Sequence, residues 1–554
     1  MIFFALASVT ARADRREITF PRSDGEVTVW PGDIAFAHDG QVGFTLVYTN
    51  AGRAAVLFSF SPTESRVVDE FDLAPDFGIG NFLIAMKVHA EAGLVVVFGA
   101  DSTGIPKVLA LSSDREGHLR KLWLSQFSVP SVFPAGPALT FNDDGSRIYF
   151  IYDDPAPQSS LLSRGDRLDT ESGITANQPR QSIALLCGAL RFRGRAPPQP
   201  TASSPRALRL ALVRAEDGSM VDTFALSFTD TSGSLFFNEV RNQLIALSGG
   251  IAYVFTPASN RLEVESSIAA DFDGGEGVDM SQNGGFLIAH AGYSPLTAKS
   301  GVNNYVVYDL ELKKARTFLV NAKLFPFSND LVFHRPTSTL FVPMKARLTQ
   351  KRNGTISLVL GGFRETDILN LTAEGALTLT AQVELPEFSP ESSVMNGLFP
   401  FNNVVVSKTG ALAFVASGNG RLFTIDTITG EIVNDELIDD KRLLSIHLVE
   451  PLNLLAFGTG TNKINLVGIS TGPVVSSVSI KESRTIVSGK NFLTGTHIQI
   501  NGVDLGLANR RADDPGHKII INLGKKDFPR AQDFSVVVVN RDGLRSEPFT
   551  FRRP

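Results

Sequence analysis

The chain has 554 residues and a formal net charge of −5, with 43% hydrophobic and 20% charged residues. This length exceeds what a single hydrophobic core fills, so two or more domains are expected. The acidic balance argues against a nucleic-acid partner, which would need a basic face. Because Cys187 is the only cysteine, an intrachain disulfide is excluded. No later segment reaches the roughly 20 apolar residues of a membrane span.

Residues 1–13 form an apolar run that ends in Ala-Arg-Ala. Such a run is typical of a secretory signal with cleavage after Ala13. A basic segment before the run is missing, so the alternatives are a start further upstream or a buried strand. The signal interpretation predicts a protein that is secreted or held in the cell envelope, in a bacterium.

Residues 14–472 are dominated by a repeat, seen most clearly in residues 404–436. Two short β-rich runs flank a turn at Thr409–Gly410, and two more flank a turn at Thr429–Gly430. The connections are too short for a crossover helix, so each repeat predicts a four-stranded antiparallel sheet. A lone sheet of this kind cannot bury both faces and needs copies of itself.

The first turn and its following strand occur eight times, which predicts an all-β fold with a β-propeller of eight blades, seven being the alternative. Uninterrupted turns, such as Asn242 and Gly284, are separated by about the 40 to 50 residues typical of propeller repeats. The eighth repeat stops before its last strand. The N-terminal strand from Glu17 is expected to supply it, since a ring whose two chain ends share one blade has no seam.

Three insertions are expected on one rim, where the second and third strands of a blade are connected. They are residues 153–206 in the third blade, the segment from Ala289 in the fifth, and the segment from Met344 in the sixth. Long loops on one rim of a rigid scaffold favour a binding site. The candidate binding residues are Tyr293, Lys345, Arg347, Lys351 and Arg352.

An acidic segment between the fourth and fifth blades contains candidate metal ligands, namely Asp271, Asp273, Glu276 and Asp279. Oxygen ligands at alternating positions with glycines between them could hold calcium, which takes six to eight such oxygens. The segment lacks a full calcium motif, so a solvated acidic turn is the preferred interpretation and no cofactor is assigned.

Other motifs favour structural roles. Gly468–Gly472 spells a nucleophile-elbow pattern, but Pro473 and a strand follow in place of the required helix. His38, His89, His334 and His447 recur near the first turn of their blades without any paired metal motif, so solvent-exposed turn residues are expected.

Residues 473–554 change to short, closely spaced strands, which predicts a small β-sandwich. The sequence of residues 488–492, Gly495, Asn501–Gly502, residues 540–543 and Ser546 resembles the IPT/TIG immunoglobulin-like domain. The preceding repeats are similar only in general style to the YVTN and WD-type propeller proteins, without their diagnostic tetrapeptides or Trp-Asp pairs.

Taken with the absence of paired catalytic residues, the insertions predict a non-catalytic exported protein that binds a protein or an extracellular polymer. The alternative is a hydrolase resembling lactonase-type propellers, with a metal held in the central channel. The acidic segment at residues 271–279 is the best support for that alternative. The oligomeric state is left open.

Overall fold

The computed structural model describes residues 15–21, 30–48, 54–77, 85–100, 105–126, 139–154, 207–226, 233–258, 261–270, 276–291, 303–320, 324–326, 331–350, 356–385, 404–416, 420–439, 443–459, 462–470, 472–510 and 516–553. Over these residues the fold is all-β, with 64% strand and 5% helix. Ten antiparallel sheets account for the strands, eight of them before residue 472. In the described part of the chain no helix is long and apolar enough to cross a membrane.

The first eight sheets are numbered here in chain order. Sheet 1 contains β2 (Trp30–Ala37), β3 (Val42–Tyr48), β4 (Ala54–Ser61) and β5 (Arg66–Asp72), and sheet 2 contains β6 (Ala85–His89), β7 (Leu94–Ala100), β8 (Pro106–Ser113) and β9 (Leu119–Gln126). Sheet 3 contains β10 (Leu139–Phe141), β11 (Arg147–Asp154), β12 (Ala207–Arg214) and β13 (Met220–Ala225), and sheet 4 contains β14 (Gly233–Asn238), β15 (Gln243–Ser248), β16 (Ile251–Ala258) and β17 (Arg261–Ala269). Sheet 5 contains β18 (Glu276–Met280), β19 (Phe286–Ala291), β20 (Asn303–Asp309) and β21 (Lys314–Val320).

Sheet 6 has five strands, β22 (Leu324–Pro326), β23 (Val332–His334), β24 (Thr339–Gln350), β25 (Ile356–Leu371) and β26 (Leu377–Glu384). Sheet 7 contains β27 (Val404–Val406), β28 (Leu412–Ala416), β29 (Arg421–Asp426) and β30 (Ile432–Leu437), and sheet 8 contains β31 (Leu443–Val449), β32 (Leu454–Thr459), β33 (Lys463–Gly468) and β1 (Arg15–Thr19). The short helices are η1 (His38–Gly40), α1 (Ala74–Phe77), η3 (Arg335–Thr337), η5 (Glu450–Leu452) and η6 (Lys525–Asp527).

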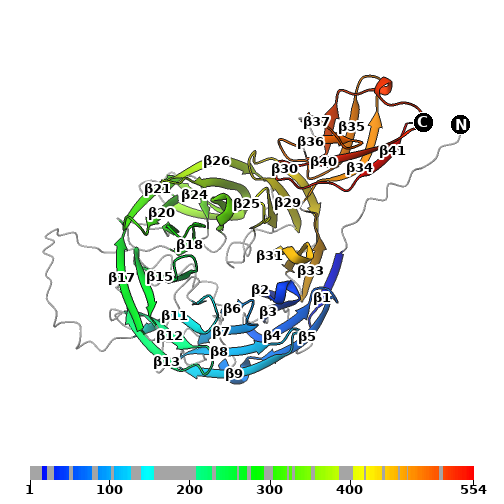
Figure 1. Ribbon diagram of the computed structural model, residues 1–554. Coiled ribbons are helices and arrows are strands. Elements are labelled where there is room, and N and C mark those ends of the chain that lie inside the picture. The colour runs from blue at the N-terminus through cyan, green and yellow to red at the C-terminus, as the bar shows by residue number, and fades with distance from the viewer. Residues whose placement is uncertain are drawn as a thin grey trace.

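The eight sheets lie around a common centre (Figure 1). The innermost strands contact one another in the order β2, β6, β10, β14, β18, β23, β27 and β31, and β31 contacts β2. Apolar side chains fill the space between neighbouring sheets, as where the rings of Phe98 and Phe150 lie 5.6 Å apart between sheets 2 and 3. Each sheet therefore buries its two faces against its neighbours.

Sheet 7 illustrates why the repeat folds in this way. All five residues of β28 are buried, as expected for an aliphatic strand covered on both faces. Gly410 and Gly430 have φ of +71° in the two turns, a conformation that favours glycine. The carboxylate of Asp426 accepts the Ile428 amide at 3.0 Å and so closes the second turn.

The N-terminal strand completes sheet 8, as the sequence predicts. β1 pairs antiparallel with β33, from Arg15 opposite Val467 to Thr19 opposite Lys463. The side chain of Ile18 is fully buried in the core between sheets 8 and 1. The two ends of the repeat region are therefore held in one sheet.

The C-terminal region forms two further four-stranded sheets. One contains β34 (Val474–Ile480), β35 (Thr485–Lys490), β39 (Lys518–Ile521) and β38 (Asn509–Arg510), and the other contains β37 (Val503–Leu507), β36 (His497–Ile500), β40 (Asp533–Val539) and β41 (Phe549–Arg552). Alternating residues of β40 are buried, and they pack with β35, β36 and β39 in one shared core. This is the packing of two sheets face to face that the sequence predicts for this region.

An ion pair attaches this C-terminal unit to sheet 7. Arg541 donates from Nη1 to Asp426 Oδ2 at 2.8 Å and from Nη2 to Asp426 Oδ1 at 2.9 Å. The amide of Thr494 also donates to Asp426 Oδ2, at 2.9 Å. Burial alone would raise the pKa of Asp426, but these hydrogen bonds and the guanidinium lower it below its usual value. Leu493 meanwhile packs into the core shared by sheets 7 and 8.

Candidate functional site

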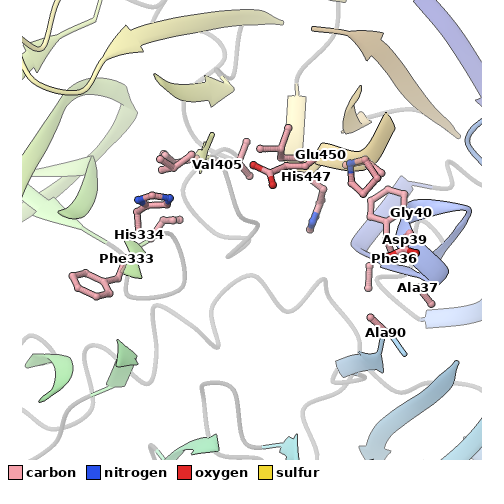
Figure 2. A pocket seen from close by; sticks show the side chains of 17 residues that line it. Phe36, Ala37, Asp39, Gly40, Ala90, Phe333, His334, Val405, His447 and Glu450 are labelled. Atoms are coloured by element: carbon pink, nitrogen blue, oxygen red, sulfur yellow. The ribbon is translucent and has the colours of Figure 1, made fainter. Parts of the chain in front are cut away.

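A cavity of about 620 Å³ lies near the common centre of the eight sheets, at the end where the first strand of a sheet turns into the second (Figure 2). Its lining comes from sheets 1, 2, 6, 7 and 8: Ala35, Phe36, Ala37, Asp39, Gly40, Ala90, Val332, Phe333, His334, Val404, Val405, Val406, His447, Leu448, Val449, Glu450 and Pro451. Strands of several sheets converge here because each innermost strand ends at the same rim. A volume of this size suits a small molecule.

His447 reaches the cavity from β31, and its ring points toward the open centre (Figure 2). The His447 side chain is half-buried and keeps some solvent contact. Desolvation nevertheless lowers the pKa of His447 to about 4. The imidazole is therefore neutral at pH 7, and one ring nitrogen can accept a hydrogen bond. The sequence prediction of an exposed turn residue is wrong for His447, because the residue lies within a strand.

His334 lies across the cavity from His447 (Figure 2). Its Nδ1 is 2.8 Å from the hydroxyl of Thr337. Burial lowers the pKa of His334, an effect that a hydrogen bond to the Lys408 backbone and the nearby charge of Glu450 partly offset. Both histidines are consequently neutral at pH 7, and the only charged groups among the described lining residues are the carboxylates of Asp39 and Glu450.

The other turn histidines connect neighbouring sheets. His89 Nε2 lies 2.9 Å from the carbonyl oxygen of Asp143 in the next sheet, and His38 Nε2 lies 3.4 Å from that of Ser113. Asn238 makes the same kind of contact, donating to the Gly284 carbonyl at 2.9 Å. These histidines are half-buried, so the prediction of solvent exposure is wrong here too. The sequence signal for these contacts between sheets was a His or Asn that recurs just before the first turn of several repeats.

The acidic segment is only partly described. Asp271 and Asp273 lie outside the described residues, and Glu276 is the first residue of β18. Asp279 pairs with Arg335 of the next sheet, with Nη2 to Oδ1 at 2.6 Å and Nε to Oδ2 at 3.2 Å. The described part of the chain contains no group of three or more His, Cys, Asp or Glu side chains placed to hold a metal. A calcium site in this segment, and the hydrolase built on it, stay predictions.

The candidate binding residues lie on sheet 6 or beyond the described residues. Lys345 and Arg347 belong to β24, whereas Tyr293, Lys351 and Arg352 fall outside the described part of the chain. The segment from Met344, expected as a loop, instead continues β24, which pairs with β25 as far as Gln350 opposite Ile356. The apolar run at residues 356–360 has the β propensity to continue the hairpin.

This extension has a third strand. β22 pairs with β24 from Leu324 opposite Arg347 to Pro326 opposite Met344. Together β22, β24 and β25 carry the rim of sheet 6 past the point where β23 and β26 end. In sheet 4, by contrast, β15 and β16 are joined by the Gly249–Gly250 turn alone. Of the other predicted insertions, residues 155–206 and 292–302 lie outside the described residues.

A buried polar cluster between sheets 5 and 6 has no counterpart in the sequence predictions. The rings of His290 and Tyr305 lie 5.4 Å apart, and Tyr305 also feels the charge of Asp367. Burial and that charge raise the pKa of Tyr305, while burial lowers the pKa of His290 to about 4. The Tyr305 hydroxyl and Asp367 Oδ2 have no hydrogen-bond partner among the described residues. His290 and Tyr305 face each other on β19 and β20, whereas Asp367 comes from the next repeat, so the local sequence does not indicate the cluster.

The nucleophile-elbow pattern lies at the connection between β33 and β34. Ser470 donates its hydroxyl hydrogen to the Gly472 carbonyl at 2.9 Å, and Asn491 donates to the Ser470 carbonyl at 2.6 Å. The serine therefore belongs to the turn between the two parts of the chain, where no helix follows it.

No family model matches the sequence, and no curated protein matches it. Sqt1 of Saccharomyces cerevisiae is a similar solved structure, with a TM-score of 0.48 and 9% identity over 82% of this chain and 98% of that one. The computationally designed Ika8 protein is similar with a TM-score of 0.43 and 9% identity, covering 82% of this chain and 99% of that one. Hydrazine synthase of Kuenenia stuttgartiensis is similar with a TM-score of 0.42 and 10% identity, covering 81% of this chain and 98% of that one. These likenesses carry no argument about activity or partners.

Proposed function

We propose that the eight sheets form a closed β-propeller of eight blades and that the C-terminal unit is an IPT/TIG-like immunoglobulin domain. The contacts of the innermost strands, which lead from β2 round to β31 and back to β2, support the first part. Two residues of the segment that resembles the IPT/TIG pattern, an asparagine and a glycine, lie where the backbone conformation or the packing favours these residue types. Asn491 has a positive φ of 58°, and a Cβ on Gly489 would lie 1.9 Å from the Val474 carbonyl oxygen.

The protein acts in this proposal as a non-catalytic interaction module or scaffold. It binds a protein or extracellular polymer through the rim that bears the insertions. The observation that supports this most directly is the three-stranded extension of sheet 6, because a projecting hairpin on a rigid ring gives a partner both a sheet edge and side chains to recognise. Lys345 and Arg347 on this extension would suit an acidic partner.

Export belongs to the same proposal, since a partner outside the cell requires it. Residues 1–13 lie outside the described residues, so the support is their apolar sequence alone. N-terminal sequencing of the native protein should give a mature start at or near Asp14. An intact Met1 on a cytoplasmic protein would contradict the export claim.

The binding proposal is tested by shortening the extension. In one variant residues 346–363 are replaced by Asn-Gly, a sequence that favours a two-residue hairpin turn. This keeps the Met344–Glu365 pair and the whole of sheet 6 below it. We expect chemical crosslinking to the native partner in the extracellular fraction to be lost, while the melting temperature changes by only a few degrees.

Charge reversal on the extension is compared with charge reversal elsewhere, which serves as the control. Lys345→Glu with Arg347→Glu should weaken crosslinking, whereas Lys314→Glu, at the turn-side end of sheet 5, should leave it intact. Equal crosslinking by the shortened variant and the wild-type chain would refute this surface as the binding site. Loss of folding in the shortened variant would show that the extension is structural.

A further inference from the structure

We propose that the central cavity binds a small organic cation, an ammonium ion with an apolar body, at the rim opposite the sheet 6 extension. The cavity lies where first strands turn into second strands, whereas the extension lies where β24 leads into β25. These connections are at opposite ends of antiparallel strands, so the two sites are separate. The proposal does not depend on the proposed partner-binding function.

Charge selects the ligand class. Asp39 and Glu450 are acidic, and no lysine or arginine is among the described residues that line the cavity. The nearest basic residue in sequence, Arg335, directly follows His334 but is held by the Asp279 carboxylate at 2.6 Å. Among the described lining residues an anionic ligand would meet two carboxylates and no cation, whereas an ammonium ion would be attracted by both carboxylates.

Hydrogen bonding points to the same class. His447 is neutral at pH 7, its ring faces the cavity, and the ring makes no hydrogen bond with any described residue. A neutral imidazole nitrogen and a carboxylate are both acceptors, and an ammonium group supplies up to three N–H donors. The Glu450 carboxylate and the His447 ring lie on the same side of the cavity (Figure 2), so one ammonium group could donate to both.

The remaining walls accommodate an apolar body. Phe36, Val332 and Val405 give the cavity apolar lining, whereas the Phe333 ring points away from the centre into the core between sheets 5 and 6. A cavity of about 620 Å³ is within the range of small-molecule sites. The site therefore combines an acidic edge with apolar walls, which suits an arylalkyl or alkyl ammonium ion better than a sugar or a nucleotide.

Isothermal titration calorimetry of the full chain at pH 7 tests this with three probes of similar shape. Phenethylammonium carries a positive charge, phenethyl alcohol is neutral and phenylacetate is negative. We expect phenethylammonium to bind about tenfold more tightly than the alcohol, the ratio that one charge-assisted hydrogen bond typically provides. Phenylacetate should not bind. No binding of the ammonium ion, or equal binding of the ammonium ion and the alcohol, would overturn the proposal.

Variants locate the binding. Glu450→Gln should reduce the preference for ammonium over alcohol to about twofold, and Asp39→Asn should reduce it less, because Asp39 is exposed. Asn is chosen at residue 39 because it tolerates the φ of +56° there. Glu216→Gln removes an equal charge from an exposed turn outside the cavity and should leave the preference unchanged. An equal loss in Glu216→Gln would overturn the proposal. The probe comparison on the wild-type chain decides the matter if Glu450→Gln fails to fold.

Discussion

Replacing Arg541 by methionine should uncouple the C-terminal sandwich from the ring. The Asp426 side chain is fully buried and Arg541 is 18% exposed, so the ion pair that joins them is largely shielded from water. Methionine keeps much of the length and apolar stem of arginine, which limits the change to the loss of the charge and its hydrogen bonds. The variant then leaves a buried carboxylate with backbone donors but no cation.

The expected cost follows from that geometry. Removing one partner of a buried ion pair typically costs about 3 to 5 kcal/mol. We take about 3 kcal/mol, because Arg541 retains some solvent contact, and this weakens docking by roughly a hundredfold. The effect depends on pH, since the folded-state pKa of Asp426 is depressed. The contribution is complete well above the usual value of 3.8 and is lost as the pH falls through the lower folded-state pKa.

Differential scanning calorimetry measures the uncoupling. We expect one joint transition in the wild-type chain at pH 7 and two separate transitions in Arg541→Met, the sandwich melting first. Arg545→Met is the control, because Arg545 is nearby but exposed and its guanidinium donates to the Gln499 side chain within the C-terminal unit; it should cost less than about 0.5 kcal/mol. Identical thermograms for the two variants would refute the claim that the Asp426–Arg541 pair joins the units.

Three further predictions concern stability. Ile18→Ala should lower the free energy of unfolding in urea by about 3 kcal/mol because the Ile18 side chain is fully buried. Ile428 is 62% exposed, so Ile428→Ala should cost almost nothing. Equal costs would contradict the closure of sheet 8 by β1. His290→Leu should reduce the loss of stability between pH 6.5 and 4 by up to about 3 kcal/mol, because the unfolded chain takes up the His290 proton first, while His447, whose pKa is lowered to a similar value, keeps its own share of that loss; an unchanged pH profile would contradict burial of the neutral ring. Gly516→Val should lower the melting temperature, because a Cβ at Gly516 would lie 2.3 Å from the Val433 carbonyl oxygen; an unchanged value would contradict this close packing of Gly516 on Val433.

The sequence alone was sufficient for the local structure. Alternating apolar strands and glycine or asparagine turns are local signals, so eight repeats predict eight antiparallel sheets, and the eight sheets are present. The incomplete eighth repeat also predicted that the N-terminal strand pairs with β33, since an unpaired outer edge would otherwise remain. The loop expected from Met344 is wrong: the segment was predicted to be an insertion in the repeat, but it continues β24 and pairs with β25 as far as Gln350.

Only the tertiary structure decided which side chains meet. Asp426 and Arg541 are 115 residues apart in the sequence, and each lies in an ordinary turn of its own, so neither local sequence predicts the ion pair. The cavity likewise brings His334 of sheet 6 together with His447 and Glu450 of sheet 8. Desolvation lowers the pKa values of His334 and His447. The extent of desolvation depends on how closely the sheets pack and not on the residues of the turn itself. Local sequence fixes strands and turns, but burial is a property of the assembled ring, and it determines the charge state of the site.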